Sequence, residues 1–108
     1  KMNQVTGKVY SGRTSGVGTA EYLVSKRDLY HHKNLEGYGP ATVDKQSFDK
    51  WAIRGREQML IDYYGGAQSV GGSSGNAING ISDWNPLRSY YLKSAIIQFG
   101  NLPNNRPQ

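Results

Sequence analysis

The 108-residue sequence contains no cysteine. This absence excludes a disulfide-stapled scaffold, a thiol nucleophile and zinc sites with cysteine ligands. The sequence also lacks an Asn-x-Ser/Thr acceptor, an N-terminal signal-peptide pattern, and any run near the roughly 18 apolar residues of a transmembrane helix. The length therefore predicts one domain with one modest core, over residues 1–100, followed by a flexible polar tail over residues 101–108.

Several catalytic signatures are missing as well. There is no G-x-x-x-x-G-K-[ST] phosphate loop, no H-E-x-x-H zinc motif and no G-x-S-x-G nucleophile turn. The glycines between residues 65 and 80 do not follow a predicted strand, so they do not form a dinucleotide-binding fingerprint. Nothing in the sequence therefore indicates a P-loop enzyme, a zinc protease, a nucleotide-dependent dehydrogenase or an α/β-hydrolase.

Acidic residues are scarce relative to basic ones. Thirteen Lys and Arg against eight Asp and Glu give a net charge of +5. The excess lies in residues 1–56, which hold ten basic and five acidic side chains, whereas residues 57–108 hold three of each. Because cations displace condensed counterions from phosphates, this balance favours a nucleic-acid partner over a basic protein without one.

Local patterns predict an α+β domain, in which a small N-terminal antiparallel β-hairpin or sheet packs with about three helices. Val5, Val9 and Tyr10 are strand formers around a predicted turn at residues 6–8. Helices are predicted from an N-cap at Thr19 to about residue 32, from about residue 48 to residue 64, and from residues 85–86 to Gly100. The second helix is expected to be capped by Asp44 or Ser47 and stopped by the glycine pair at 65–66. The apolar residues of the last helix are predicted core: Tyr90, Tyr91, Ile96, Ile97 and Phe99.

Polar residues continue the apolar stripe of the first predicted helix. Ala20, Leu23 and Val24 share one face at helical spacing, and Arg27 and His31 extend it. These two side chains lie either at the frayed end of the helix or at a site. His32 points about 100° away from His31 on a helix, so the two histidines cannot both face one ligand.

The second predicted helix carries a glutamate on an apolar face. Glu57 lies between Ile53 and Leu60 at heptad-like spacing. A carboxylate is rarely buried without a partner. Glu57 is therefore expected to pair with a cation such as Arg27, to bind a metal, or to lie at the edge of a cleft.

The segment Lys8-Val9-Tyr10-Ser11-Gly12-Arg13-Thr14 resembles the second, "YIG", motif of GIY-YIG nucleases. In that family a helix follows with an arginine and a histidine one turn later, and Arg27 and His31 fit this spacing. A later helix carries a single metal-binding glutamate, which Glu57 matches, and an asparagine follows after a loop, for which Asn76 and Asn79 are the candidates.

The second half of the chain is similar to the C-terminal tips of Rhs-type and other polymorphic bacterial toxins. The similarity lies in the Arg-Gly-Arg-Glu-Gln helix at 54–58, the Gly-Gly-Ala-Gln turn at 65–68 and the Gly-Asn-x-Ile-Asn-Gly-Ile-Ser loop at 75–82. The two resemblances together cover residues 5–95 and imply a toxin domain of the GIY-YIG (URI) nuclease type.

One feature departs from the family pattern. The family has an earlier strand with its own tyrosine, but only nine residues precede Tyr10 and none is a tyrosine. Either Tyr10 serves alone, or Tyr22, Tyr30 or Tyr38 substitutes, or the chain has been cut just after that strand. Ser11 stands where the family has an apolar residue.

The resemblance implies a magnesium- or manganese-dependent endonuclease, with DNA as the favoured substrate. Tyr10 would help to activate water, Arg27 would hold the phosphate, and His31 would relay a proton. Glu57 would bind one Mg²⁺ (or Mn²⁺), and Asn76 or Asn79 would orient groups near the phosphate. The implied nucleic-acid-binding residues are Gly12, Arg13, Lys26, Arg54, Arg56 and Asn79.

Two other functions remain open: a metal-independent ribonuclease toxin on a similar basic scaffold, and a non-catalytic nucleic-acid-binding module. Taken without the resemblance, Tyr10 can be a plain strand aromatic, and Asn76 and Asn79 can be left-handed turn residues. A toxin of this type is expected to be a monomer without a membrane segment. It would be secreted or delivered by a larger bacterial protein, would act in the target-cell cytoplasm, and would be neutralised by a cognate immunity protein.

Overall fold

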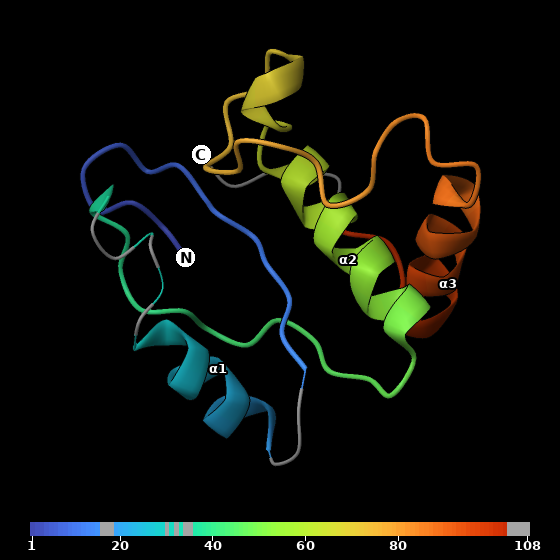
Figure 1. Cartoon of the computed structure of the whole chain (residues 1–108), viewed down its shortest axis with the longest axis horizontal. Coiled ribbons are helices and arrows are strands. Elements are labelled where there is room, and N and C mark those ends of the chain that lie inside the picture. Colours follow the sequence, from blue (N-terminus) through green and yellow to red (C-terminus); the bar gives the residue numbers. More distant parts are fainter. Residues whose placement is uncertain (16–18, 30, 32, 34–35, 104–108) are drawn as a thin grey trace.

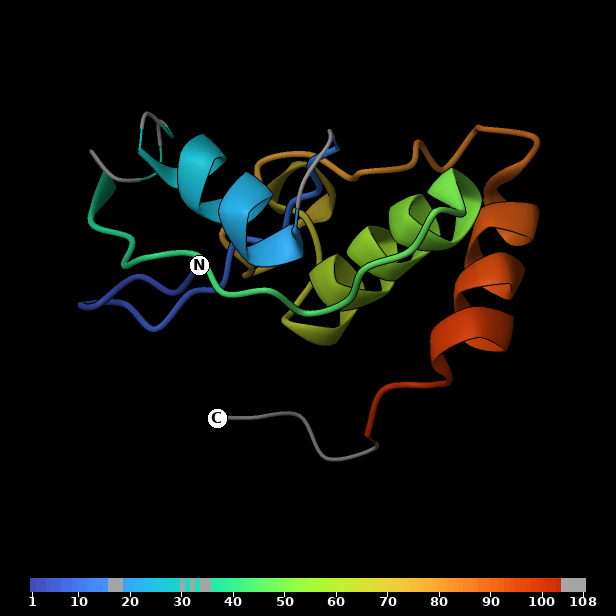
Figure 2. The ribbon, with the colours of Figure 1, turned by 90° about the horizontal axis from the view of Figure 1, so that it is seen from below.

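The computed structural model describes residues 1–15, 19–29, 31, 33 and 36–103. Three α-helices form its framework: α1 (Ala20–Asp28), α2 (Lys50–Tyr63) and α3 (Arg88–Phe99), with a short 3₁₀ helix, η2 (Gln68–Val70), between the last two. The N-terminal segment lies between α1 and the α2–α3 pair (Figure 1). In both views α1 and α3 lie on opposite sides of α2 (Figure 1 and Figure 2). No helix among the described residues has the length and apolar character needed to cross a bilayer.

The predicted N-terminal β-hairpin or sheet is wrong, because the described residues contain no β-strand. The chain does reverse direction, but only through isolated antiparallel bridges between Met2 and Val9 and between Asn3 and Tyr38. Backbone hydrogen bonds join Lys1 with Tyr10 and Asn3 with Lys8. The side-chain oxygen of Asn3 accepts from the backbone N–H groups of Val5 and Thr6, so the pairing ends after a few residues at a turn, where Val5 is 91% exposed.

The α2–α3 pair packs through small residues. Gly55, Ala52 and Ala95 are buried at the crossing, and a side chain at Gly55 would collide with the backbone carbonyl of Tyr91. This close approach explains why a glycine lies in the middle of α2 despite its cost to helix stability. The remaining buried apolar residues are Tyr38, Ile61, Ala67 and Ile81. The core is therefore small and centred on α2.

The prediction that the apolar residues of the last helix belong to the core is wrong for three of the five. Tyr90, Ile96 and Ile97 are 61%, 41% and 76% exposed, because α3 packs against α2 along one face and leaves these side chains on the other faces. Tyr91 lies in the α2–α3 contact, where its ring stacks on Trp51.

Helix ends follow their capping groups. Thr19 caps α1 as predicted, by accepting a hydrogen bond from the N–H of Tyr22. The cap of α2 is Asp49, which accepts from the N–H groups of Trp51 and Ala52, so the prediction of Asp44 or Ser47 is wrong. Gly65 and Gly66 end α2 with positive φ angles, as predicted.

Two helix boundaries differ from the prediction. α1 ends at Asp28 instead of near residue 32, and His31 lies beyond the helix. α3 begins at Arg88, because Asn85 forms a turn in which its side chain accepts from the N–H of Leu87 and its carbonyl accepts from the N–H of Arg88. Tyr30 and His32, and residues 104–108 of the predicted tail, lie outside the described residues.

Candidate active site

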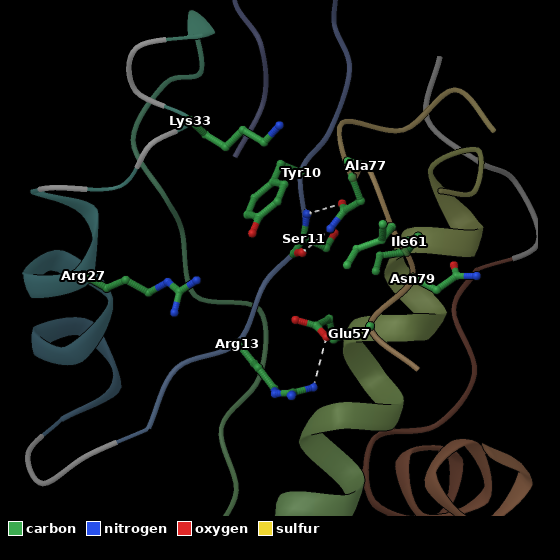
Figure 3. A pocket seen from close by; sticks show the side chains of 12 residues that line it. Tyr10, Ser11, Arg13, Arg27, Lys33, Glu57, Ile61, Ala77 and Asn79 are labelled. Carbon is green, nitrogen blue, oxygen red and sulfur yellow. Dashed lines mark hydrogen bonds and ion pairs between the residues drawn. The ribbon is translucent and has the colours of Figure 1, made fainter. Parts of the chain in front are cut away.

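A cavity of about 550 Å³ opens where five separate segments meet: the N-terminal segment, α1, the residues around Lys33, α2 and the loop at 76–80. Figure 3 shows side chains of the N-terminal segment, of α1, of α2 and of the loop at 76–80 facing this space. Most of the residues expected at the site line it: Tyr10, Arg13, Arg27, Glu57, Asn76 and Asn79. A larger cavity of about 1530 Å³ shares several of these residues and adds His31 and Gly12. The structure thus brings together residues that are up to 70 positions apart in the chain.

Glu57 forms the acidic centre of the cavity. Its Oε1 atom lies 3.2 Å from Nη1 of Arg13, and its side chain is only 11% exposed. The expected pairing with a cation is confirmed, but the partner is Arg13 and not Arg27. Burial raises the pKa of the Glu57 carboxyl, and the charges of Arg13, Arg27 and Arg54 partly offset this rise. Glu57 is therefore more basic than an ordinary surface glutamate.

Gly80 makes room for this carboxylate. A Cβ atom at position 80 would collide with Oε1 of Glu57. The loop backbone can therefore approach the carboxylate closely only because residue 80 has no side chain.

His31 and Arg27 lie together on the opposite side of the cavity. The Nη2 atom of Arg27 is 3.5 Å from Nε2 of His31, and the backbone N–H of Lys33 donates to Nδ1 of the same ring at 3.2 Å. Arg27 can only donate hydrogen bonds, so the role of Nε2 in this contact depends on the tautomer of the ring. The His31 ring and the Arg27 guanidinium therefore lie side by side at the larger cavity.

Tyr10 packs against a cluster of aromatic and cationic groups. Its ring lies 5.1 Å from the His31 ring and 6.4 Å from the Tyr38 ring, measured between centroids. Nζ of Lys33 lies 5.2 Å from the Tyr10 centroid and 5.4 Å from the Tyr38 centroid, within cation–π range. The Tyr10 hydroxyl points into the space between the Arg27 guanidinium and the Glu57 carboxylate (Figure 3).

Asn76 holds the backbone next to Tyr10. Its Oδ1 accepts from the N–H of Ser11 at 2.8 Å, and its Nδ2 donates to the carbonyl of Ser11 at 2.7 Å. The N–H of Gly75 also donates to the carbonyl of Val9 at 2.7 Å. Asn76 thus acts on Tyr10 through the backbone of the neighbouring residue. The alternative that Asn76 is a left-handed turn residue is wrong, since every described residue with positive φ is glycine.

Asn79 is positioned by a fully buried glutamine. Nε2 of Gln58 donates to Oδ1 of Asn79 at 2.9 Å, and Oε1 of Gln58 accepts from the N–H of Ile81 at 3.0 Å. Gln58 therefore ties the 79–81 loop to α2, directly after Glu57.

The basic residues expected to bind nucleic acid fall into different settings. Arg13 and Arg54 line the larger cavity, and Arg54 also donates to the carbonyl of Gly80 and to the hydroxyl of Tyr91. Arg56 is buried, and its guanidinium holds both carboxylate oxygens of Asp44 at 2.7 and 3.1 Å. Lys26 is exposed on α1 and lines neither cavity. Arg13, Arg27 and Arg54 are therefore better placed than Lys26 or Arg56 to meet a phosphate.

The cavity offers the expected Mg²⁺ or Mn²⁺ ion one carboxylate. Among the described residues, Glu57 is the one acidic side chain that lines the smaller cavity, and no group of three or more His, Asp or Glu side chains is placed to hold a metal. The amide oxygens of Asn76 and Asn79 already accept hydrogen bonds. A divalent cation would meet Glu57 and the repulsion of the nearby guanidinium groups, and waters or substrate phosphates would have to supply its other oxygen ligands.

Sequence reasoning missed three residues of this region. Lys33, Gln58 and Trp51 line a cavity or shape its wall. Gln58 gave a weak signal, because it is polar and directly follows Glu57 on a helix with apolar faces. Lys33 and Trp51 gave no signal, since their placement depends on contacts with Tyr10 and Tyr91 from distant segments.

No family model matches the chain, and no curated protein or solved structure matches it either. The chemistry of the cavity therefore rests on its own geometry. It combines one basic carboxylate, a tyrosine hydroxyl, an imidazole ring and several guanidinium groups around one space. Such a set can bind an anion and transfer protons next to it.

Proposed function

We propose that the chain is a nuclease that cleaves a phosphodiester bond of RNA by proton transfer between side chains. The observation that carries this proposal is the convergence of Tyr10, Arg27, His31 and Glu57 from separate segments on one cation-rich space. A phosphodiester is the anion that a basic chain with these proton-transferring groups is best suited to receive.

Arg27 and His31 would hold the phosphate. The guanidinium of Arg27 can donate two hydrogen bonds to phosphate oxygens in a fixed geometry, and the His31 ring beside it can donate to the same phosphate when it is protonated. Both donors would stabilise the additional negative charge of the transition state.

Glu57 and Tyr10 would transfer the protons. The Glu57 carboxylate removes the proton of the 2′-hydroxyl, O2′ attacks phosphorus, and the bond between phosphorus and O5′ breaks. The Tyr10 hydroxyl gives its proton to the departing O5′ and regains one from Glu57 through water. The products are a 2′,3′-cyclic phosphate and a 5′-hydroxyl. The raised pKa of Glu57 supports its assignment as the base.

The guanidinium groups around Glu57 would repel a divalent cation, which favours RNA over DNA. RNA carries its own nucleophile, the 2′-hydroxyl, next to the scissile phosphate, so cleavage needs only a base, an acid and charge stabilisation. A magnesium-dependent DNA endonuclease is a second candidate. It is favoured by the placement of Glu57, because one carboxylate and substrate phosphates can together hold Mg²⁺. It requires the Arg13–Glu57 ion pair to open first.

The experiment uses purified protein with single-stranded RNA, DNA of the same sequence and supercoiled plasmid, each in Mg²⁺ and in EDTA. We expect RNA cleavage in both buffers, a cyclic phosphate product, and no cleavage of RNA that carries 2′-O-methyl groups. Plasmid nicking in Mg²⁺ alone would establish the second candidate. Binding to all three substrates without cleavage would show a binding module and overturn both.

We also propose that this activity serves as a bacterial toxin. The similarity of residues 54–82 to polymorphic toxin tips supports this role, and the cationic cavity would suit an immunity protein with an acidic surface. The toxin would be delivered by a larger protein and act in the cytoplasm of the target cell. Expression in a bacterial cytoplasm should arrest growth for the native chain and spare it for Glu57→Gln. Equal growth arrest by both would contradict the toxin proposal.

A further inference from the structure

The larger cavity continues beyond the proposed cleavage site along the N-terminal half of α2. It shares Tyr10, Arg27 and Glu57 with the smaller cavity and extends to Arg54 and Trp51. Its lining contains seven Lys or Arg residues and three Asp or Glu residues, so its charge complements a polyanion. A nucleic-acid strand with its phosphate beside Glu57 would therefore pass Trp51.

Trp51 is a large aromatic side chain that is held in place but only partly covered. Its ring stacks on the Tyr91 ring with 4.4 Å between centroids and 23° between planes. Arg54 fixes Tyr91 in turn: its Nη1 donates to the tyrosine hydroxyl at 3.0 Å, and its guanidinium carbon lies 4.6 Å from the ring centroid. Trp51 nevertheless remains 41% exposed and lines the cavity.

The spacing between Trp51 and Glu57 suits neighbouring nucleotides. Glu57 lies six positions after Trp51 on α2, which corresponds to about 9 Å along the helix axis. Arg54 lies between them and lines the same cavity. A base next to the cleaved phosphate could therefore reach the indole while Arg54 faces the connecting backbone.

We propose that Trp51 is a stacking platform for an unpaired base adjacent to the cleaved phosphate. This inference rests on the proposed nuclease function and adds to it that the substrate is single-stranded. An aromatic face binds any base by stacking, but it can do so only when the base has left its duplex. The Tyr91–Arg54 contacts pre-order the indole, so little conformational freedom is lost on binding.

The test measures binding separately from cleavage. The sequence has two tryptophans, and Trp84 is 92% exposed and lines neither cavity. Trp84→Phe therefore leaves Trp51 as the sole tryptophan. The probe is a non-cleavable single-stranded 2′-O-methyl oligonucleotide, compared with its duplex and with a strand in which one nucleotide at a time is abasic.

We expect the single strand to quench Trp51 fluorescence and the duplex to leave it unchanged. One abasic position should abolish quenching. Trp51→Leu should weaken binding of the single strand about 5- to 150-fold, while Trp51→Phe should retain most of the affinity and Trp84→Ala all of it. Trp51→Leu keeps an apolar contact with Tyr91, and thermal melting should show that it folds.

Equal quenching by every abasic strand would contradict the proposal that Trp51 stacks on a base. Equal affinity of the native protein and Trp51→Leu for the single strand would contradict it as well. Equal affinity for single strand and duplex would overturn the proposed substrate class. These outcomes differ from failure of the proposed function, in which native protein cleaves no RNA whatever its fluorescence shows.

Discussion

The side-chain amide of Asn76 pairs with both backbone polar groups of Ser11, 65 residues earlier in the chain. Both residues are buried, so water cannot replace these hydrogen bonds. An asparagine thereby does the work that a neighbouring strand would do in a sheet. It fixes the backbone that carries Tyr10 against the loop that borders Glu57.

Asn76→Ala should reduce both stability and activity. It leaves the N–H and the carbonyl of Ser11 without partners, which should lower the free energy of unfolding by about 2–4 kcal/mol. Urea unfolding measures this loss. Asn101→Ala, at an exposed position, is the matched control and should change nothing. An unchanged midpoint for Asn76→Ala would show that the pairing does not stabilise the fold.

Glu57→Gln should remove cleavage and preserve the fold. The amide keeps the shape of the side chain but cannot accept the proton, and losing a general base lowers rates about 10²- to 10⁴-fold. Initial rates on labelled RNA measure the loss, and circular dichroism checks the fold. Glu21→Gln, on the exposed first turn of α1, should cleave at the native rate. A Glu57→Gln protein with native activity would remove Glu57 from the mechanism.

The pH dependence should report the environment of Glu57. Burial raises the pKa of its carboxyl, so the ionised base should appear at higher pH than for an ordinary glutamate. The cleavage rate should therefore rise with pH, with a midpoint above the usual glutamate range. The same group favours the folded state most when it is protonated in acid, and this contribution is lost as pH rises through the raised pKa. Stability curves of the native protein and of Glu57→Gln should differ in this window, and coincident curves would contradict the burial effect.

Gly80→Ala should damage the site more than the fold. The new methyl group would meet the end of the flexible Glu57 side chain, which can swing away at modest cost. We expect a melting temperature close to the native one and a rate reduced at least 10-fold, since catalysis is sensitive to small displacements. Gly55→Ala is a useful contrast, because its methyl group would meet the backbone of Tyr91 and should destabilise the α2–α3 pair. A native rate for Gly80→Ala would show that the carboxylate position is not critical.

Arg27→Gln should weaken both binding and cleavage. The substitution removes the guanidinium beside His31, so the slope of log affinity against log salt should fall by about 1 for single-stranded RNA. Lys26→Gln removes the same charge one residue earlier, outside both cavities, and should keep the native cleavage rate. Equal effects of the two substitutions would show that only net charge matters.

The sequence predicted the helices well because their signals are local. The oxygen of Thr19 and the glycines at 65–66 act on neighbouring residues, and the structure shows them at the ends of α1 and α2. The cap of α2 was missed because Asp44 and Ser47 have other partners, Arg56 and Gln98, that only the fold supplies. The predicted hairpin strands do not form, because the pairing of residues 1–3 with residues 8–10 ends at a turn in which Val5 is exposed.

The part of the candidate site that could be predicted also depends on local spacing along the helices. Helical spacing placed Glu57 on an apolar face, which implied a partner, but the partner is Arg13 from a segment that spacing cannot position. Arg27 and His31 do lie together, although α1 ends before His31, so the contact arises from the turn that follows the helix. Lys33 and Trp51 become part of the site only through Tyr10, Tyr38 and Tyr91.

The hydrogen bonds between Ser11 and Asn76 also determine when the cavity can form during synthesis. A ribosome makes residue 11 well before residue 76, because 65 residues separate them. Until residue 76 has been made, the backbone of Ser11 lacks the side chain that holds it in the folded structure. The cavity is therefore assembled only after both of these segments have been synthesised. The same dependence applies to refolding, because the cavity forms again only when the two segments meet.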